Sequence, residues 1–245
     1  MHRLPRFFIT PDQVQDRGIT IVGDDVHHIR SVLRMQLGDM LTLSNGQGIE
    51  YVARITDITK QKIKAEIVSE SEGRILLPQV ILGQGLPKSD TMDLIVQKAT
   101  ELGVEQIVPL ITERTVVKIG QEQKRISRWQ KISLNAAKQS DRSTIPHITD
   151  IQSFTGFLNS LESRPDTLFL IPDEHATGSL KQILREQKEI QKVTIVIGPE
   201  GGFSEKELQA ARSKNFHPIS LGSTILRTET AALAALSIIR YEFHT

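Results

Sequence analysis

The chain has 245 residues, of which 24% are charged and 38% hydrophobic, a composition typical of folded globular proteins with one large or two modest domains. It contains no cysteine, which excludes a disulfide framework, a thiol nucleophile and a cysteine-based zinc site. Residues 1–8 lack the apolar stretch of a signal peptide, and no window reaches the about 18 apolar residues of a membrane span. We therefore expect a cytoplasmic protein without a membrane partner.

The net charge of +1 does not by itself indicate nucleic-acid binding, but the charge is unevenly distributed. Residues 114–142 hold eight basic against two acidic side chains. Such a segment is either a solvated helix face or a surface that contacts phosphates, and charge alone does not decide between them.

Residues 19–69 contain short runs in which apolar side chains alternate with polar ones. This pattern predicts strands near residues 20–22, 40–43, 51–55 and 63–67, and Asn45-Gly46 is a hairpin signal. A helix-like stretch at residues 27–34 interrupts the series. We expect residues 1–72 to form a small β-barrel and residues 73–245 to form a second domain, which begins close to Leu77-Pro78.

The second domain alternates between predicted strands and helices. Ser89 or Asp90 is expected to cap its first helix, and Gly103 to end it. The alternation predicts an α/β domain with a mostly parallel sheet covered on both faces. The strands are expected near residues 80–83, 106–111, 167–171, 193–197 and 218–221, and the helices near 91–102, 125–138, 180–187, 205–212 and 229–241.

Ligands of such sheets bind beyond the carboxyl ends of the strands, which are expected here near Ile171, residues 198–202 and residues 221–223. Residues 198–202, the glycine loop, lie between a strand and a helix that begins with the capping box Ser204/Glu207. The loop permits close approach of a ligand to the backbone, although a tight turn is the alternative. It matches neither a P-loop nor a dinucleotide-binding pattern, and Glu200 would repel a phosphate.

A second loop, residues 221–226, comes at the end of the next strand and leads through Arg227 into the last helix, for which Thr228 is a fair N-cap. This helix is apolar on nearly all sides, which indicates either a core helix or one shared with a second copy of the chain. A basic helix ends in the polar segment 135–146. It is either a favourably charged helix end or a segment in which Arg142 lines a substrate pocket.

These segments resemble the RsmE family, bacterial 16S ribosomal RNA uracil-N3 methyltransferases of the SPOUT superfamily. The resemblance is carried by residues 197–202 (IGPEGG), 221–231 (LGSTILRTETA), 98–104 (KATELGV) and 137–146 (AKQSDRSTIP), and by Arg6-Phe7-Phe8, residues 27–29 (HHI) and 32–35 (VLRM). It implies a PUA-like RNA-binding barrel, a SPOUT α/β domain with a trefoil knot, and an obligate homodimer. The general rule that chains are unknotted would not predict the knot.

The resemblance also implies that S-adenosylmethionine binds in the knot, held mainly by backbone groups. The cofactor-binding residues are then Leu170, Ile171, Ile197, Gly198, Pro199, Glu200, Gly201, Gly202, Ser220, Leu221, Gly222, Ile225, Leu226, Thr230 and Ala231. A sulfonium cation would remove the objection to Glu200. No metal is expected, because His27-His28 lacks an accompanying carboxylate pattern.

For methylation of uracil N3, Arg142 or Arg227 is expected to stabilise negative charge on the uracil oxygens, and Glu200 or Glu229 to assist loss of the N3 proton. Replacing Arg142 with alanine should lower turnover more than cofactor affinity. Because N3 lies on the pairing edge, the uridine must be unpaired or extruded.

The partner would be 16S ribosomal RNA within the small ribosomal subunit. The candidate RNA-binding residues are Arg6, Phe7, Phe8, Arg30, Arg34, Arg114, Lys138 and Arg142, although Phe7-Phe8 can equally pack in a core. Two alternatives remain: a related methyltransferase that acts on transfer RNA or another base, and a non-catalytic RNA-binding assembly factor that binds no cofactor.

Overall fold

The structure is a computed structural model that describes residues 4–73, 76–88, 90–116, 120–176, 178–187 and 189–243. It divides into two compact units, which are described separately. The first contains the described residues within Met1–Ile75 together with Ala137–Ile145, and the second those within Leu76–Ala136 and Pro146–Thr245. Ser89, an expected helix cap, and Lys118, in the basic segment, lie outside the described residues.

The first unit is built on a curled sheet of six strands among the described residues. The strand order is β1-β4-β5-β6-β3-β2, with β1 parallel to β4 and the other pairs antiparallel. The strands are β1 (Arg6–Phe8), β2 (Val14–Gln15), β3 (Gly18–Val22), β4 (Met40–Ser44), β5 (Ile49–Ile58) and β6 (Lys62–Glu72), with the short helix η1 (Pro11–Gln13).

Alternation of side chains explains the core of this unit. Ile19 and Ile21 of β3 and Leu41 and Leu43 of β4 are almost fully buried in one hydrophobic cluster. The four strands predicted here are confirmed, as is the turn at Asn45, whose Oδ1 accepts hydrogen bonds from the backbone N–H of two following residues. The helix-like stretch is α1 (Asp24–His27), which continues as a π-helical turn, η2 (His28–Val32).

The segment 137–145 completes the first unit. Ser44 Oγ donates a hydrogen bond to the Ser143 carbonyl (2.6 Å), and Ile145 N donates to the Gly46 carbonyl (3.0 Å). The side chain of Ser143 lies so close to Gly73 that a Cβ there would come within 2.5 Å of it. No sequence pattern indicated this pairing.

The second unit is a sheet in which every pair of described strands is parallel, in the order β10-β8-β7-β12-β11-β13 with β9 on β8. The strands are β7 (Gln79–Gly85), β8 (Gln106–Ile111), β9 (His147–Ile148), β10 (Gln152–Ser153), β11 (Thr167–Pro172), β12 (Lys192–Ile197) and β13 (His217–Ile219). The helices are α2 (Thr91–Glu101), α3 (Glu122–Gln139), α4 (Phe154–Ser160), α5 (Leu180–Glu186), α6 (Glu205–Ser213) and α7 (Thr228–Phe243).

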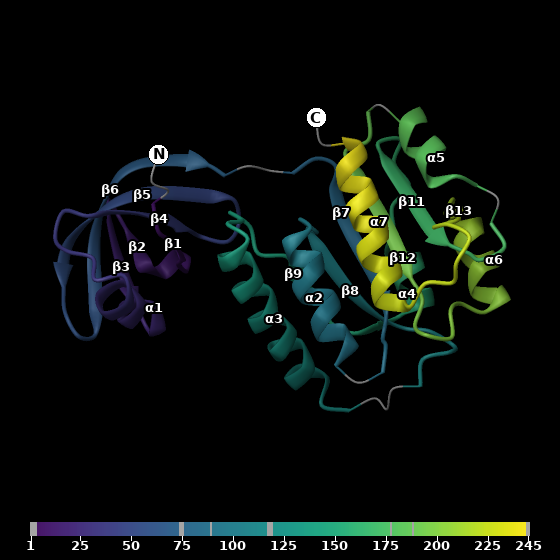
Figure 1. The fold of residues 1–245 in the computed structure, drawn as a ribbon, viewed down its shortest axis with the longest axis horizontal. Helices are drawn as coiled ribbons and strands as arrows, with labels where there is room; N and C mark the ends of the chain where they lie inside the picture. Colours follow the sequence, from purple (N-terminus) through teal and green to yellow (C-terminus); the bar gives the residue numbers. More distant parts are fainter. Residues whose placement is uncertain are drawn as a thin grey trace. The chain divides into compact units, whose positions relative to one another are not determined.

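Two hydrophobic clusters cover the two faces of this sheet. Ile195 of β12 faces the cluster that includes α2, α5 and α7, whereas its neighbour Val196 faces the cluster built with α4 and α6. α7, yellow in Figure 1, packs against α2 and lies over β7 and β12. The prediction of a parallel sheet covered on both faces is therefore confirmed. None of the described helices combines the length and apolar character needed to cross a membrane.

Two expected helix caps differ from the structure. Asp90 stands at the N-cap of α2, but its side chain makes no capping hydrogen bond and instead reaches Arg128 (3.4 Å). Thr228 is the first residue of α7 rather than the residue before it, and its hydroxyl donates to the Gly198 carbonyl. Gly103 follows α2 with φ of +84°, as a C′ glycine should, and Ser204 and Glu207 form the predicted capping box.

Candidate functional site

The three strand ends singled out by the sequence belong to neighbouring strands, because β12, β11 and β13 are consecutive in the sheet. Ile197 ends β12, Leu170 and Ile171 lie buried near the end of β11, and Ser220 and Leu221 follow β13. In a parallel sheet these carboxyl ends share one edge, so the residues expected to bind a cofactor gather there.

The glycine loop is a compact turn packed on the end of β7. Gly202 has φ of +68° and its N–H donates to the Pro199 carbonyl (2.8 Å). Gly85 allows Pro199 to lie against the strand, since a Cβ at Gly85 would come within 2.6 Å of the proline Cδ. Glycine at these positions is thus required by the turn and by the close approach of two backbones.

Two neighbouring loops hold the glycine loop from outside. Glu200 Oε1 accepts a hydrogen bond from the backbone N–H of Lys88 (2.8 Å), just beyond β7. Arg114 Nη1, just beyond β8, donates to the Gly201 carbonyl (2.7 Å). Glu200 was expected to bind the cofactor or accept a proton, and Arg114 to bind RNA. Both side chains also position this loop, and the expected roles stay predictions.

A third contact reaches the glycine loop from inside the unit. Thr228 Oγ1 donates to the Gly198 carbonyl (2.6 Å) and accepts from Gln84 Nε2 (2.9 Å). Gln84 is fully buried near the end of β7. Sequence reasoning missed Gln84. The available signal was a polar residue inside an otherwise apolar strand.

Glu207 does more than cap α6. Its side chain is buried, and it accepts hydrogen bonds from the N–H of Ser204 and of Glu113, each 2.9 Å long. The loop after β8 is thereby joined to the start of α6. The sequence predicted the local contact but not the distant one.

The second loop is open to solvent. Gly222 has φ of +128°, and residues 222–225 and Arg227 are exposed. The side chain of Ile225 is 87% exposed, although it is apolar. Leu226, Glu229 and Ala231 are half-buried, and Thr230 is exposed. Arg227 and Glu229 thus flank the buried Thr228 at the start of α7.

Arg142 lies in the first unit, where it is buried and its Nη2 donates to Thr144 Oγ1 (2.9 Å). Lys138, in the same unit, pairs with Asp25 (2.8 Å). The basic segment is therefore divided, because Arg114 belongs to the second unit.

The other candidate RNA contacts differ in exposure. Phe7 is only 3% exposed and packs edge-on against His28, so it offers no face to a base, whereas Phe8 is half-buried. Arg6 pairs with Glu50. Arg30 and Arg34 are exposed near the π-helical turn, and Arg114 of the second unit is exposed as well.

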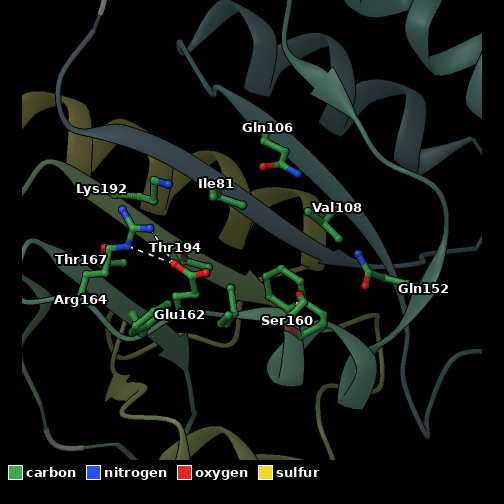
Figure 2. Close-up of a pocket in the computed structure, with 13 residues that line it drawn as sticks. Ile81, Gln106, Val108, Gln152, Ser160, Glu162, Arg164, Thr167, Lys192 and Thr194 are labelled. Atoms are coloured by element: carbon green, nitrogen blue, oxygen red, sulfur yellow. Dashed lines mark hydrogen bonds and ion pairs between the residues drawn. The ribbon is translucent and has the colours of Figure 1, made fainter.

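A cavity of about 300 Å³ lies near the amino ends of the strands, whereas the predicted site lies at their carboxyl ends. Gln106, Thr167 and Lys192, which begin β8, β11 and β12, line it together with α4 and the ion pair Arg164–Glu162 (Figure 2). Thr194 also lines it, and Thr194 Oγ1 is buried without a hydrogen-bond partner among the described residues. No sequence motif indicated this cavity.

Comparison with known families assigns both units. Residues 76–240 match the family model of an RNA methyltransferase domain, and residues 21–68 that of an RNA methyltransferase PUA domain. Ribosomal RNA small subunit methyltransferase E of Bacillus subtilis is 33% identical over 98% of this chain and 97% of its own. The protein of the same name from Rickettsia conorii is 33% identical over 96% and 94%.

Solved structures agree with this assignment. The chain matches ribosomal RNA small subunit methyltransferase E of Neisseria gonorrhoeae, bound to S-adenosylmethionine, with a TM-score of 0.83, 33% identity and 98% coverage of both chains. A methyltransferase from Legionella pneumophila in complex with the same cofactor gives a TM-score of 0.83 at 32% identity, again with 98% coverage of both chains.

Proposed function

Because the chain belongs to the ribosomal RNA small subunit methyltransferase E family, we propose that it transfers a methyl group from S-adenosylmethionine to N3 of one uridine in 16S ribosomal RNA. The observation that carries the proposal is the gathering of the glycine loop, the second loop and the end of β11 at one edge of the parallel sheet. That edge is where α/β folds bind their ligands.

The residues at this edge fit S-adenosylmethionine. At Gly202 and Gly222 an added Cβ would meet no described atom within 4 Å, so the backbone of both loops borders open space that a flat ring can approach. The nearby carboxylates Glu200 and Glu229 suit a cation better than a phosphate. Backbone groups of residues 197–202 and 220–226, with Leu170, Ile171, Thr230 and Ala231, would hold it.

The chemistry requires a proton to leave uracil N3 while negative charge builds on the base. When bound, S-adenosylmethionine supplies a methyl group activated by its positively charged sulfur. Glu229 would accept the proton and Arg227 would stabilise the charge on the uracil oxygens, since both flank Thr228 at the proposed site. Glu200 and Arg142 are the alternative residues for these two roles.

The presence of two compact units supports separate roles in RNA binding and in methyl transfer. We propose residues 1–72 as the RNA-binding domain, completed by residues 137–145, and the rest of residues 73–245 as the methyltransferase domain. Arg30 and Arg34 would contact phosphates, and a small ribosomal subunit in the cytoplasm would be the substrate.

We further propose a homodimer and a trefoil knot in the second unit. The support is exposed apolar surface: Ile238 and Tyr241 lie on one side of α7 with 38% and 83% exposure, and Ile225 precedes the helix. A second copy would cover such side chains, which water solvates unfavourably.

Mass spectrometry of nucleosides tests the proposed reaction. Purified protein is incubated with unmodified small ribosomal subunits, with and without S-adenosylmethionine. We expect 3-methyluridine only when the cofactor is present. A different methylated nucleoside would overturn the proposed base and atom, and no product together with no cofactor binding would favour a non-catalytic RNA-binding protein.

A further inference from the structure

We propose that Gln84 is a positioning residue for the cofactor site, acting through Thr228 on the Gly198 carbonyl. The inference rests on the proposed function, because it concerns the same glycine loop. In the sheet, Gln84 pairs with Ile197, the residue directly before that loop. Strand register therefore places this side chain beside the loop.

The hydrogen bonds form a chain with a defined direction. Gln84 Nε2 uses its two hydrogens on the Gly85 carbonyl (2.9 Å) and on Thr228 Oγ1 (2.9 Å). The Thr228 hydroxyl, which accepts from the amide, donates its own hydrogen to the Gly198 carbonyl (2.6 Å). This chain orients the first peptide of the glycine loop and ties it to the helix start that carries Arg227 and Glu229.

A purely structural role does not explain why the residue is glutamine. Gln84 is fully buried, yet its Oε1 has no hydrogen-bond partner among the described residues. A buried acceptor without a partner destabilises the folded state, and an apolar side chain of the same length would avoid that loss. Departures of this kind concentrate where a protein is constrained by function. We infer that glutamine is needed at this position for the two N–H donors of its amide.

Gln84→Met keeps the length of the side chain and removes the amide, and Thr228→Val removes the hydroxyl. We expect each to raise the Kd for S-adenosylmethionine about tenfold in titration calorimetry, roughly the effect of one hydrogen bond. Thr228→Ser should bind like the wild type. The double variant should bind no more weakly than either single variant, because both changes break one chain.

Thr194→Val is the matched control, because Thr194 Oγ1 is also buried without a described partner but lies in the cavity near the amino ends of the strands (Figure 2). It should leave the Kd unchanged. The melting temperature of Gln84→Met should stay within about 2 °C of the wild type, since the loss of an unpartnered acceptor offsets the lost bonds.

Hydrogen exchange in the cofactor-free protein gives a second readout. Peptides that cover residues 198–203 should exchange faster in Gln84→Met and Thr228→Val, but not in Thr194→Val. Unchanged exchange together with unchanged affinity overturns the inference, as does equal weakening by Thr194→Val. If the wild type binds no cofactor while loop exchange responds as expected, the proposed function fails and the positioning role of Gln84 on the loop stands.

Discussion

Glu200 illustrates how a contact can limit the roles of a side chain. One of its carboxylate oxygens accepts the Lys88 N–H, and the residue lies in the turn that begins with Gly198. A glutamine side chain retains such an acceptor but cannot take up a proton. Glu200→Gln therefore distinguishes a structural hydrogen bond to the Lys88 N–H from a role as general base.

For Glu200→Gln we expect turnover within about threefold of the wild type, because a general base would contribute roughly 10²–10⁴-fold. Glu200→Ala, which removes the acceptor of the Lys88 hydrogen bond, should weaken S-adenosylmethionine binding. Single-turnover methylation of small ribosomal subunits and calorimetry are the measurements. A hundredfold slower reaction with Glu200→Gln would make Glu200 the proton acceptor.

Arg227 is the exposed cation nearest in sequence to the bond chain at Thr228. If it stabilises charge that develops only during reaction, Arg227→Ala should reduce turnover by about 10²-fold and leave cofactor affinity nearly unchanged. Arg185→Ala, at an exposed arginine of α5 that pairs with Glu242, is the control and should have no effect. Equal losses of affinity and turnover would contradict this role.

At the scale of elements, α7 connects core and surface. Ala232, Leu236 and Ile239 are buried against the sheet, whereas Ile238 and Tyr241 face outward. The sequence left a core helix and a shared helix as alternatives. The structure places α7 in the core cluster, and its exposed apolar side chains support the dimer proposal.

Ile238→Glu should convert a dimer to a monomer, because burying an unpaired carboxylate in an apolar interface is strongly unfavourable. Light scattering coupled to size-exclusion chromatography measures the mass. Val68→Glu, at an exposed valine of β6 in the first unit, is the control and should leave the mass unchanged. A wild-type monomer would refute the dimer directly.

How far the sequence predicts each element depends on whether the responsible interaction is local. Alternation and capping are local, so the strands β3 to β6 of the first unit, the strands β7, β8, β11, β12 and β13 of the second, and the Ser204/Glu207 capping box could be predicted. The short strands β1, β2, β9 and β10 were not predicted. Gln84, by contrast, meets Thr228 across 144 positions of chain, and neither residue carries a pattern that indicates the other. The seven-residue helix α4 was not predicted, whereas α5, which has the same length, was.

The basic segment shows the same limit. The positive charge of this segment is evident from the sequence, but its division between the two units is not. The three-dimensional fold places Arg114 in the second unit and Lys138 in the first, and composition carries no information about that. The knot and the roles of the catalytic residues stay predictions.

At the scale of the whole molecule, binding of RNA should depend steeply on salt. A protein that contacts phosphates displaces counterions, so the logarithm of affinity falls linearly with the logarithm of salt concentration. Replacing both Arg30 and Arg34 with alanine should lower that slope by roughly 1.5, at about 0.7–0.9 per phosphate contact. Lys181→Ala, on α5, is the control, and fluorescence anisotropy with a 16S RNA fragment is the measurement. An unchanged slope would remove the two arginines from the RNA surface.

The small sheet is closed by chain that returns to it much later, since Ser44 and Gly46 pair with residues 143–145. The residues of the first unit are therefore encoded in two separate stretches of the gene. A recombination that moved only the first 75 codons would deliver a sheet with unpaired backbone groups at its turn. We therefore expect the two units to be inherited together, and a descendant that discarded the methyltransferase unit would have to replace residues 137–145 to keep a stable RNA-binding module.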